Sequence, residues 1–437
     1  MGKNVLILGA GRVSAPCIDY LARKGNCGIV ACDVLEENVS ATAKMFPQAH
    51  AVRVDAGTSS ASLIDEYGPD LVIALLPPQL IPDVAKICLE KRVNLAHPAY
   101  LDDATLALSK DVESSGLIFL TEIGLDPGID HMSAVCSIEE IHARGGKVES
   151  FRSLCGALPA PEANNNPWGY KLSWSPSSLI GASKRSAKIL DDGKIVSWPD
   201  GETYEHVYML DIPGFSFEVY ANADSTVYRE GYGIPEVKSL YRGTLRYPGW
   251  CETICYMNMI KFFDTDEQDI KGLTFAQFAA RQADVSGDPK LTLCERFGFK
   301  PWSAFILRME WLGFFDDRPI PFSRGSARDV VSHLFAEKLV FAPEERDLVV
   351  LYDEIKSVFP NGGKELHRSV LVDYGVPGKW TSIAKTTGVP LAVAARFILD
   401  GTIITPGVHK PTLKEIYGPV LRELADEGIA LEQKIIK

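Results

Sequence analysis

The chain has 437 residues, of which 46% are hydrophobic and 23% are charged, and its formal net charge at pH 7 is −12. This length is typical of two or three domains with sizeable hydrophobic cores. The negative charge argues against nucleic acid or an anionic membrane as a partner, because both require a basic surface. Nine cysteines without a C-x-x-C pair indicate neither a disulfide framework nor a bound metal.

The hydrophobic pattern gives no sign of a membrane segment or a secretion signal. No run approaches eighteen apolar residues, and the first apolar run already has the length of a strand. We therefore expect a cytoplasmic protein that does not interact with membranes.

A glycine-rich turn follows the first apolar run. Val5 to Leu8 is short enough for a strand, and Gly9, Gly11 and Ser14 occupy the small positions of a G-x-G-x-x-G pattern. Gly9 would permit the tight turn, and Gly11 would let a pyrophosphate approach the backbone. A helix that begins near Arg12 would direct its free N–H groups at the phosphates.

An acidic residue follows at the end of the second apolar run. Gly28 to Cys32 reads as a strand, and Asp33 comes about 20 residues after Gly11, where a carboxylate accepts hydrogen bonds from the adenine ribose. Because this carboxylate would repel a 2′-phosphate, we predict NAD rather than NADP as the cofactor. The alternative is a glycine turn in an α/β domain that binds no nucleotide.

Strands and helices alternate through residue 128. Strands are expected at 51–54, 71–75, 93–96 and 118–120, and helices at 60–67, 82–90 and 104–115. This alternation predicts a doubly wound parallel sheet, in which ligands bind outside the carboxyl ends of the strands. The residues expected at that crevice are Asp33, Asp55, Leu76, Pro77, Ala99, Tyr100 and the loop 122–128.

The pattern changes after Gly128. A helix at 130–142 and a strand at 147–155 lead into residues 150–260, whose turn and aromatic signals predict an antiparallel sheet that forms the substrate wall. Residues 265–341 are helical, with Ser326 as the expected N-cap of a helix at 327–339. Strands at 348–352 and 369–372 predict a hairpin, and the chain from 381 onward is predicted to be helical.

Five motifs together resemble the saccharopine dehydrogenase family of the L-glutamate-forming type. They are EIGLDPGIDH (122–131), CGALPAPE (155–162), KLSWS (171–175), DST (224–226) and RGTLRY (242–247), and the resemblance continues to EIYGP (415–419). The resemblance implies a Rossmann domain, a β-sheet domain that binds substrate and forms a homodimer, and a small helical domain. It also implies oxidation of saccharopine to glutamate and 2-aminoadipate semialdehyde, or the reverse, in lysine metabolism.

The resemblance and the chain pattern together divide the sequence. We expect an NAD-binding Rossmann domain (1–128), an α+β substrate-binding and dimerisation domain (129–264), a small helical domain (265–341), a hairpin that returns to the α+β domain (342–380) and a C-terminal helical segment (381–437).

The resemblance also assigns candidate site residues. The cofactor contacts fall on Gly9, Gly11, Arg12, Val13, Asp33, Leu76, Ala99, Leu125, Asp126, Pro127 and Ser175. The contacts with the amino-acid substrate fall on Tyr100, Asp126, Cys155, Trp174, Thr244, Leu245 and Arg246. Fungal members specific for NADP tend to have arginine at the position of Asp33, which agrees with the prediction of NAD.

Three of these residues are the catalytic candidates. Oxidation of a secondary amine needs a deprotonated nitrogen, a hydride acceptor and a water that attacks the iminium. We predict that Asp126 orients the amine, with a helix cap as the alternative role. Cys155 could hydrogen-bond the substrate or relay a proton, or be a buried apolar thiol. Tyr100 could donate a proton, or be a core aromatic residue.

The remaining candidates have competing roles too. Arg246 is the predicted carboxylate clamp, because guanidinium binds carboxylate in a bidentate fork, and a surface salt bridge is the alternative. Trp174 would form an apolar wall or pack in a core. For His131 a structural role is favoured over a catalytic one.

Several positions depart from the family pattern. Ala223 stands where the resemblance leads us to expect an arginine that holds a substrate carboxylate, so either Arg246, Arg242 or Lys171 replaces it or the substrate lacks that carboxylate. Pro78, Ile81 and the Pro98-Ala99 pair also differ from the family. The substitution at Ala223 raises the alternative of a dehydrogenase of a related N-carboxyalkyl amine, such as a carboxypolyamine or an opine-like adduct. A separate alternative is a non-catalytic NAD-binding scaffold.

Overall fold

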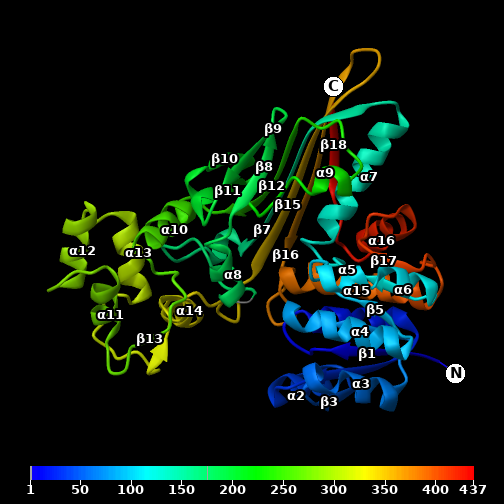
Figure 1. Cartoon of the computed structure of the whole chain (residues 1–437), viewed down its shortest axis with the longest axis horizontal. Coiled ribbons are helices and arrows are strands. Elements are labelled where there is room, and N and C mark those ends of the chain that lie inside the picture. The colour runs from blue at the N-terminus through cyan, green and yellow to red at the C-terminus, as the bar shows by residue number, and fades with distance from the viewer. Residues whose placement is uncertain (1, 175) are drawn as a thin grey trace. The chain divides into compact units, whose positions relative to one another are not determined.

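The computed structural model describes residues 2–174 and 176–437, with the backbone alone at residues 177 and 178. The chain forms two compact units (Figure 1). The first unit contains Met1–Val148 and Leu351–Lys437, and the second contains Glu149–Val350.

The first unit is built on a parallel β-sheet. Across this sheet, the described strands are β3 (Ala49–Arg53), β2 (Cys27–Asp33), β1 (Lys3–Leu8), β4 (Leu71–Ala74), β5 (Asn94–Ala96), β6 (Ile118–Leu120) and β17 (Gly407–His409). Every neighbouring pair is parallel. The order of the strands reverses between β1 and β4, which is where ligands bind in sheets of this type. The predicted doubly wound sheet is confirmed.

Helices connect these strands and cover the sheet. They are α1 (Ser14–Tyr20) with a π-helical turn (Leu21–Gly25), α2 (Glu36–Met45), α3 (Ala56–Tyr67), a 3-10 turn (Pro78–Leu80), α4 (Ile81–Lys91), α5 (Asp103–Ala107), α6 (Ser109–Ser114), α7 (Ile129–Ala143), α15 (Ser382–Leu399) and α16 (Lys414–Asp426). Asp55 caps α3 by accepting a hydrogen bond from the Gly57 N–H. The helix predicted at 104–115 is interrupted at Leu108.

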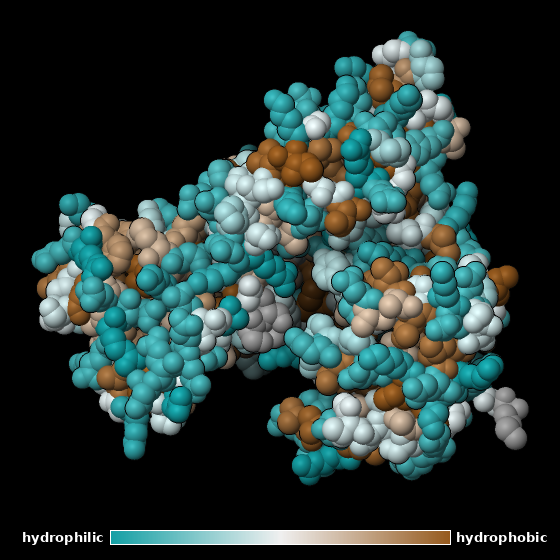
Figure 2. Space-filling model, viewed as in Figure 1, coloured by the Kyte–Doolittle hydropathy of each residue, from teal (hydrophilic) through white to brown (hydrophobic). Residues whose placement is uncertain are grey.

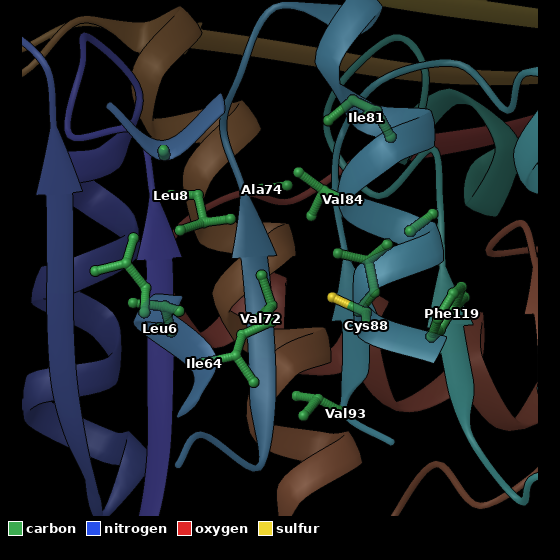
Figure 3. Close-up of a cluster of buried hydrophobic side chains, with 14 of the residues drawn as sticks. Leu6, Leu8, Ile64, Val72, Ala74, Ile81, Val84, Cys88, Val93 and Phe119 are labelled. Atoms are coloured by element: carbon green, nitrogen blue, oxygen red, sulfur yellow. The ribbon is translucent and has the colours of Figure 1, made fainter. Parts of the chain in front are cut away.

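A hydrophobic core joins the sheet to α3 and α4. Figure 3 shows Leu6 and Leu8 of β1 and Val72 of β4 with Val84 and Cys88 of α4, all of them buried. Because strands that are covered by helices on both faces need apolar residues at successive positions, the runs at 5–8 and 71–74 are continuous rather than alternating.

The C-terminal segment contributes to this unit in a way that the sequence did not predict. Helix α15 packs against α1, and Gly407–His409 pairs with β6 as an edge strand. Glu432–Ile436 forms a further strand, β18, which pairs with β16 (Lys364–Tyr374). The prediction that the chain is purely helical from residue 381 was therefore wrong at these two strands. The first has only three residues, between Pro406 and Lys410, and the second is a charged, exposed edge strand, so neither shows strand periodicity.

Helix α15 is apolar because it is a core helix. Among the described residues, it is the one helix whose length and composition would suit a membrane span. However, 72% of it is buried inside the structure. Gly388 of α15 lies so close to α1 that an added Cβ atom would be 2.5 Å from the Val13 carbonyl oxygen.

The second unit contains a mixed sheet. Strand β7 (Lys147–Pro159) pairs with β12 (Ser239–Arg246), which pairs with β11 (Phe215–Ala221), and β11 pairs with β10 (Tyr208–Ile212). A hairpin of β8 (Ala187–Asp191) and β9 (Lys194–Trp198) joins β12 through β8. The β7–β12 pair is parallel rather than antiparallel as predicted, because a long connection returns the chain in its original direction.

The predicted hairpin is confirmed and is longer than expected. Its strands are β15 (Asp347–Val358) and β16 (Lys364–Tyr374), and β18 (Glu432–Ile436) extends it in an antiparallel register. The turn is closed by the Phe359 N–H, which donates to the Gly363 carbonyl oxygen over 2.9 Å.

Helices make up much of the remainder of the second unit. They are α8 (Pro176–Ala182), α9 (Tyr228–Gly231), α10 (Trp250–Met259), α11 (Phe275–Gln282), α12 (Pro289–Phe297), α13 (Ala304–Leu312) and α14 (Ala327–Lys338), with 3-10 turns at Pro161–Ala163 and Glu202–Glu205 and a small ribbon of β13 (Gln268–Asp269) and β14 (Arg324–Gly325). The predicted N-cap at Ser326 is confirmed, and Asp329 completes a capping box.

Hydrophilic residues predominate on the face of the molecule that Figure 2 shows, and hydrophobic residues gather there in small groups.

The close contact at Gly388 predicts a large effect of Gly388→Ala. The added methyl group would meet the backbone of α1 at 2.5 Å and 3.2 Å, so one helix must shift. We expect the free energy of unfolding to fall by about 1–3 kcal/mol, although alanine itself favours a helix. Denaturant unfolding measures this.

Gly418→Ala in α16 is the matched control, since its nearest neighbour is the flexible Arg422 side chain at 3.7 Å. It should be neutral or stabilising by up to about 1 kcal/mol. Equal stability of the two variants would contradict tight packing at Gly388.

Candidate active site

The turn after β1 has the geometry that its two glycines predict. Gly9 has a φ of +100°, and a Cβ atom there would lie 2.3 Å from the Leu75 carbonyl oxygen, so only glycine fits. At Gly11 a Cβ atom would meet no heavy atom within 4 Å. The backbone is therefore tightly packed at the first glycine and open at the second.

The first turn of α1 has no side-chain cap. Val13 is the N-cap residue without a side-chain hydrogen bond, and the first turn contains no acidic residue. Arg12 is exposed, and Ser14 Oγ donates to the Gly11 carbonyl oxygen over 2.8 Å. Uncapped N–H groups beside an open glycine fit the pyrophosphate of a dinucleotide.

Asp33 is held at the end of β2 by two backbone donors. Its Oδ2 accepts from the Ala10 N–H over 2.9 Å and its Oδ1 from the Leu35 N–H over 2.8 Å. The residue is 9% exposed. Arg53 lies next to this strand end, since its Nε donates to the Val34 carbonyl oxygen over 3.4 Å.

The apolar cofactor candidates are placed by the same sheet. Leu76 and Ala99 are half-buried and pack against the core cluster of Figure 3. Leu125 and Pro127 are buried in the loop after β6. The cofactor candidate Ser175 lies outside the described residues.

Tyr100 and Asp126 form a hydrogen-bonded pair. The Tyr100 hydroxyl donates to Asp126 Oδ1 over 3.0 Å. Tyr100 is 45% exposed, so it is not the core aromatic residue that was its alternative. The cap of α7 is Gly128, and the carboxylate that accepts from the Gly128 N–H is that of Asp130, so the capping alternative for Asp126 does not hold.

A buried network of charged groups supports the loops that carry Tyr100 and Asp126, and Glu122 is at its centre. Glu122 is 1% exposed, and its Oε2 lies 2.7 Å from His131 Nε2. Its Oε1 accepts from the Leu101 N–H and from Lys410 Nζ, both over 2.9 Å. Burial alone would raise the pKa of Glu122, but these partners outweigh it and lower the pKa to about 2. The structural role favoured for His131 agrees with this geometry.

His97 is buried just before the segment that contains Tyr100. It is fully inaccessible, and neither ring nitrogen has a hydrogen-bond partner among the described residues. Burial lowers its pKa to about 4, although Asp102 and Glu122 oppose the shift. His97 is therefore neutral in the folded protein at neutral pH.

The substrate candidates of the second unit lie on two paired strands. Cys155 of β7 is opposite Thr244 of β12, and Cys155 is 9% exposed. Leu245 is fully buried, and a Cβ atom on Gly156 would lie 2.8 Å from its Cβ atom. These strands therefore pack too closely for a larger residue at position 156.

Arg246 lies in an aromatic cage. Its guanidinium carbon is 5.0, 5.6 and 6.0 Å from the ring centres of Tyr170, Trp250 and Tyr220. Arg246 is 4% exposed, its Nη1 donates to the Leu245 carbonyl oxygen over 2.8 Å, and its Nε has no partner among the described residues. It is not a surface salt bridge, and a buried guanidinium of this kind fits an anionic ligand.

The other predicted residues near this cage have protein partners. Trp174 Nε1 donates to the Tyr170 hydroxyl over 2.7 Å. Lys171 pairs with both oxygens of Glu345, at 2.6 and 2.5 Å, so it is a poor replacement for the missing arginine. Arg242 lies over the Tyr228 ring at 4.3 Å. Ala223 has a φ of +54°.

Metal ligands do not gather in the part of the chain that the structure describes: no three His, Cys, Asp or Glu residues are placed to hold an ion. In the first unit, the candidate residues are the glycine turn, which is of the type that binds nucleotides, and the hydrogen-bonded Tyr–Asp pair. In the second unit, they are the arginine in its aromatic cage and the cysteine on the paired strand. The sequence missed Glu122, Lys410 and His97 as contributors and did not identify the rings around Arg246.

Two family matches cover most of the chain. Residues 5–120 match the saccharopine dehydrogenase NADP binding domain, and residues 124–429 match the saccharopine dehydrogenase C-terminal domain.

Individual relatives are similar over the full length. A curated relative from Saccharomyces cerevisiae, saccharopine dehydrogenase (NADP+, L-glutamate-forming), is 38% identical over 100% of both chains. The apo structure of saccharopine dehydrogenase (L-Glu forming) from the same organism has a TM-score of 0.91 at 35% identity, over 100% of both chains. The mitochondrial alpha-aminoadipic semialdehyde synthase of Bos taurus is 35% identical over 98% of this chain and 47% of its own length.

The burial of His97 predicts an acid-sensitive fold. Since its pKa is about 4 in the folded state against an ordinary 6.5, the unfolded chain binds a proton first as the pH falls. The free energy of unfolding should therefore drop by up to about 3 kcal/mol between pH 6.5 and pH 4. His97→Leu, which cannot be protonated, should show a smaller drop in denaturant titrations across this range.

The exposed His50 supplies the control, because His50→Gln should keep the wild-type dependence on pH. A His97→Leu variant with the same acid loss as the wild type would assign that loss to other groups.

Proposed function

Because the chain belongs to the saccharopine dehydrogenase family, we propose that it oxidises the secondary amine of saccharopine with a nicotinamide nucleotide, giving L-glutamate and 2-aminoadipate 6-semialdehyde, or catalyses the reverse condensation. The observation that carries this proposal is the full-length similarity to a relative of that name. We propose a homodimer on the same basis.

The turn at Gly9 and Gly11, the uncapped start of α1 and Asp33 are the residues that would hold the nucleotide. When bound, a nicotinamide nucleotide accepts the hydride. Before that transfer the protein must orient the amine and take up its proton, and afterwards a water must attack the iminium to release the two products. The Tyr100–Asp126 pair is suited to this task, because a carboxylate that already accepts one hydroxyl hydrogen bond can orient an amine and move a proton through that hydroxyl.

Arg246 supports an amino-acid substrate. A guanidinium buried among three aromatic rings, with an unpartnered Nε, favours a carboxylate, because the ligand would supply the charge that the protein does not. Arg246 is the strongest of the three candidates to replace the arginine missing at Ala223, since Lys171 is already paired with Glu345.

The full-length similarity supports this function over a carboxypolyamine dehydrogenase and over a non-catalytic scaffold. The substitution at Ala223 is the feature that suggests a carboxypolyamine dehydrogenase. In the structure, Ala223 adopts a left-handed conformation at φ +54° in the loop after β11.

For the cofactor we propose NAD. The carboxylate of Asp33 is fixed by two backbone N–H groups and cannot turn away from a 2′-phosphate without losing them. The yeast relatives carry NADP in their names. In this chain the Asp33 carboxylate would repel a 2′-phosphate, whereas the neighbouring Arg53 would attract one.

The substrate proposal predicts that the purified protein reduces NAD with saccharopine, as measured by the absorbance of the reduced nucleotide. Arg246→Gln should raise the KM for saccharopine about 10- to 150-fold, because a charged hydrogen bond contributes about 1.5–3 kcal/mol. The KM for the nucleotide should hardly change. Arg281→Gln, on the exposed side of α11, should leave both values unchanged.

Two outcomes would contradict the proposal. Turnover of a carboxyspermidine-type amine but not of saccharopine, with saccharopine activity gained in Ala223→Arg, would assign a changed substrate. Tight binding of the reduced nucleotide without oxidation of any amine would support the scaffold.

The cofactor proposal predicts the effect of Asp33→Asn. Removal of the charge should lower the ratio of kcat/KM for NAD to that for NADP by about 10- to 100-fold, because a like charge beside a phosphate costs several kcal/mol. The exposed Asp65→Asn serves as a control for surface charge. A wild type that prefers NADP, or a ratio unchanged in Asp33→Asn, would show that Asp33 does not select the cofactor.

A further inference from the structure

The loops that follow three neighbouring parallel strands, together with the first turn of α7, meet at one carboxylate, that of Glu122. Strand β6 lies between β5 and β17, and Glu122 follows β6 directly. The Thr121 N–H donates to the His409 carbonyl oxygen over 2.8 Å, which places Lys410 beside Glu122. On the other side, the Glu122 N–H donates to the Ala99 carbonyl oxygen over 3.2 Å.

The side chain of Glu122 ties these segments together. Leu101 comes from the β5 loop, Lys410 from the loop after β17 and His131 from the first turn of α7, and each contributes a group within 2.9 Å of the carboxylate. The carboxylate is 1% exposed, whereas Lys410 is 40% exposed. The buried anion is therefore held by His131 and the Leu101 N–H, and also by Lys410, a cation that reaches it from the surface.

The backbone at Glu122 is strained as well. Its φ is +56°, a left-handed conformation that residues with a Cβ atom seldom adopt. Strain of this kind persists where surrounding contacts hold it, commonly at functional sites.

The residues that this network holds are next to the proposed proton-handling pair. Tyr100 stands between Ala99 and Leu101, which both bond to Glu122. Asp126 belongs to the loop that starts at Glu122 and ends at α7. The 3.0 Å hydrogen bond between Tyr100 and Asp126 thus joins two loops whose spacing the Glu122 carboxylate sets.

We propose that Lys410 and Glu122 are positioning residues for the reaction: their ion pair fixes the spacing of the 99–101 and 122–127 loops and so holds the Tyr100 hydroxyl on Asp126. This inference rests on the proposed function. It assigns a role in the chemistry to a lysine far along the chain that contacts neither Tyr100 nor Asp126 in any described hydrogen bond.

The test compares Lys410→Met and Lys410→Arg with the wild type in the saccharopine assay. Lys410→Met keeps the aliphatic stem and removes the charge. We expect kcat to fall about 10- to 100-fold, because small displacements of reacting groups have effects of this size. The KM for the nucleotide should stay within about threefold, and Lys410→Arg should restore most of kcat. Lys414→Met, an exposed lysine at the start of α16, is the control and should match the wild type.

A double variant tests whether Lys410 acts through the Tyr100 hydroxyl. If it does, Lys410→Met should cost little further activity in a Tyr100→Phe background, so the two effects should not multiply. Multiplying effects would overturn the proposed route.

The remaining outcomes are also distinct. A wild type inactive with saccharopine and every other amine would defeat the proposed function. An active wild type whose Lys410→Met variant loses only thermal stability, with kcat unchanged, would make the pair merely structural and overturn this inference alone.

Discussion

The parallel pairing of β1 with β4 is the constraint on which the rest of the first unit depends. At the end of this pair, the carbonyl oxygen of Leu75 leaves no room for a side chain on Gly9, so the chain must turn there. The turn leads into α1. Gly388 of α15 packs against α1 so closely that a side chain is excluded there as well. Two close contacts, each possible only because the residue is glycine, therefore set the position of the start of α1, which would receive a phosphate.

From this point the functional groups follow the strand order. Asp33, Ala99, Tyr100 and Asp126 come from the carboxyl ends of β2, β5 and β6, which a parallel sheet brings to one edge. The polar groups are not independent of each other: Asp33 is bonded to the glycine turn through Ala10, and Tyr100 is bonded to Asp126. Next to them, the buried Glu122 carboxylate is paired with Lys410 and His131 and accepts the Leu101 N–H, so its charge is compensated where burial without partners would be costly.

The second unit solves a different electrostatic problem. Arg246 is buried and surrounded by the rings of Tyr170, Tyr220 and Trp250, whose faces attract a cation without neutralising it. Lys171, only a short distance along the chain from Trp174, is instead neutralised by Glu345. The contrast is between a buried cation that aromatic rings surround and a cation that is paired with a carboxylate of the fold.

The local signals in the sequence were sufficient for the doubly wound sheet, the glycine turn, the position of Asp33 at the end of a strand, the Ser326 cap and the hairpin after 347, because each depends on residues close together in the chain. Long motifs were sufficient for the family. Only the tertiary structure decided that β7 and β12 run parallel, that Gly407–His409 is the edge of the first sheet, that Lys410 reaches Glu122 and that aromatic rings enclose Arg246. These features join segments that are far apart in sequence, so their energy comes from burial and charge pairing in the folded state, and no local periodicity encodes it.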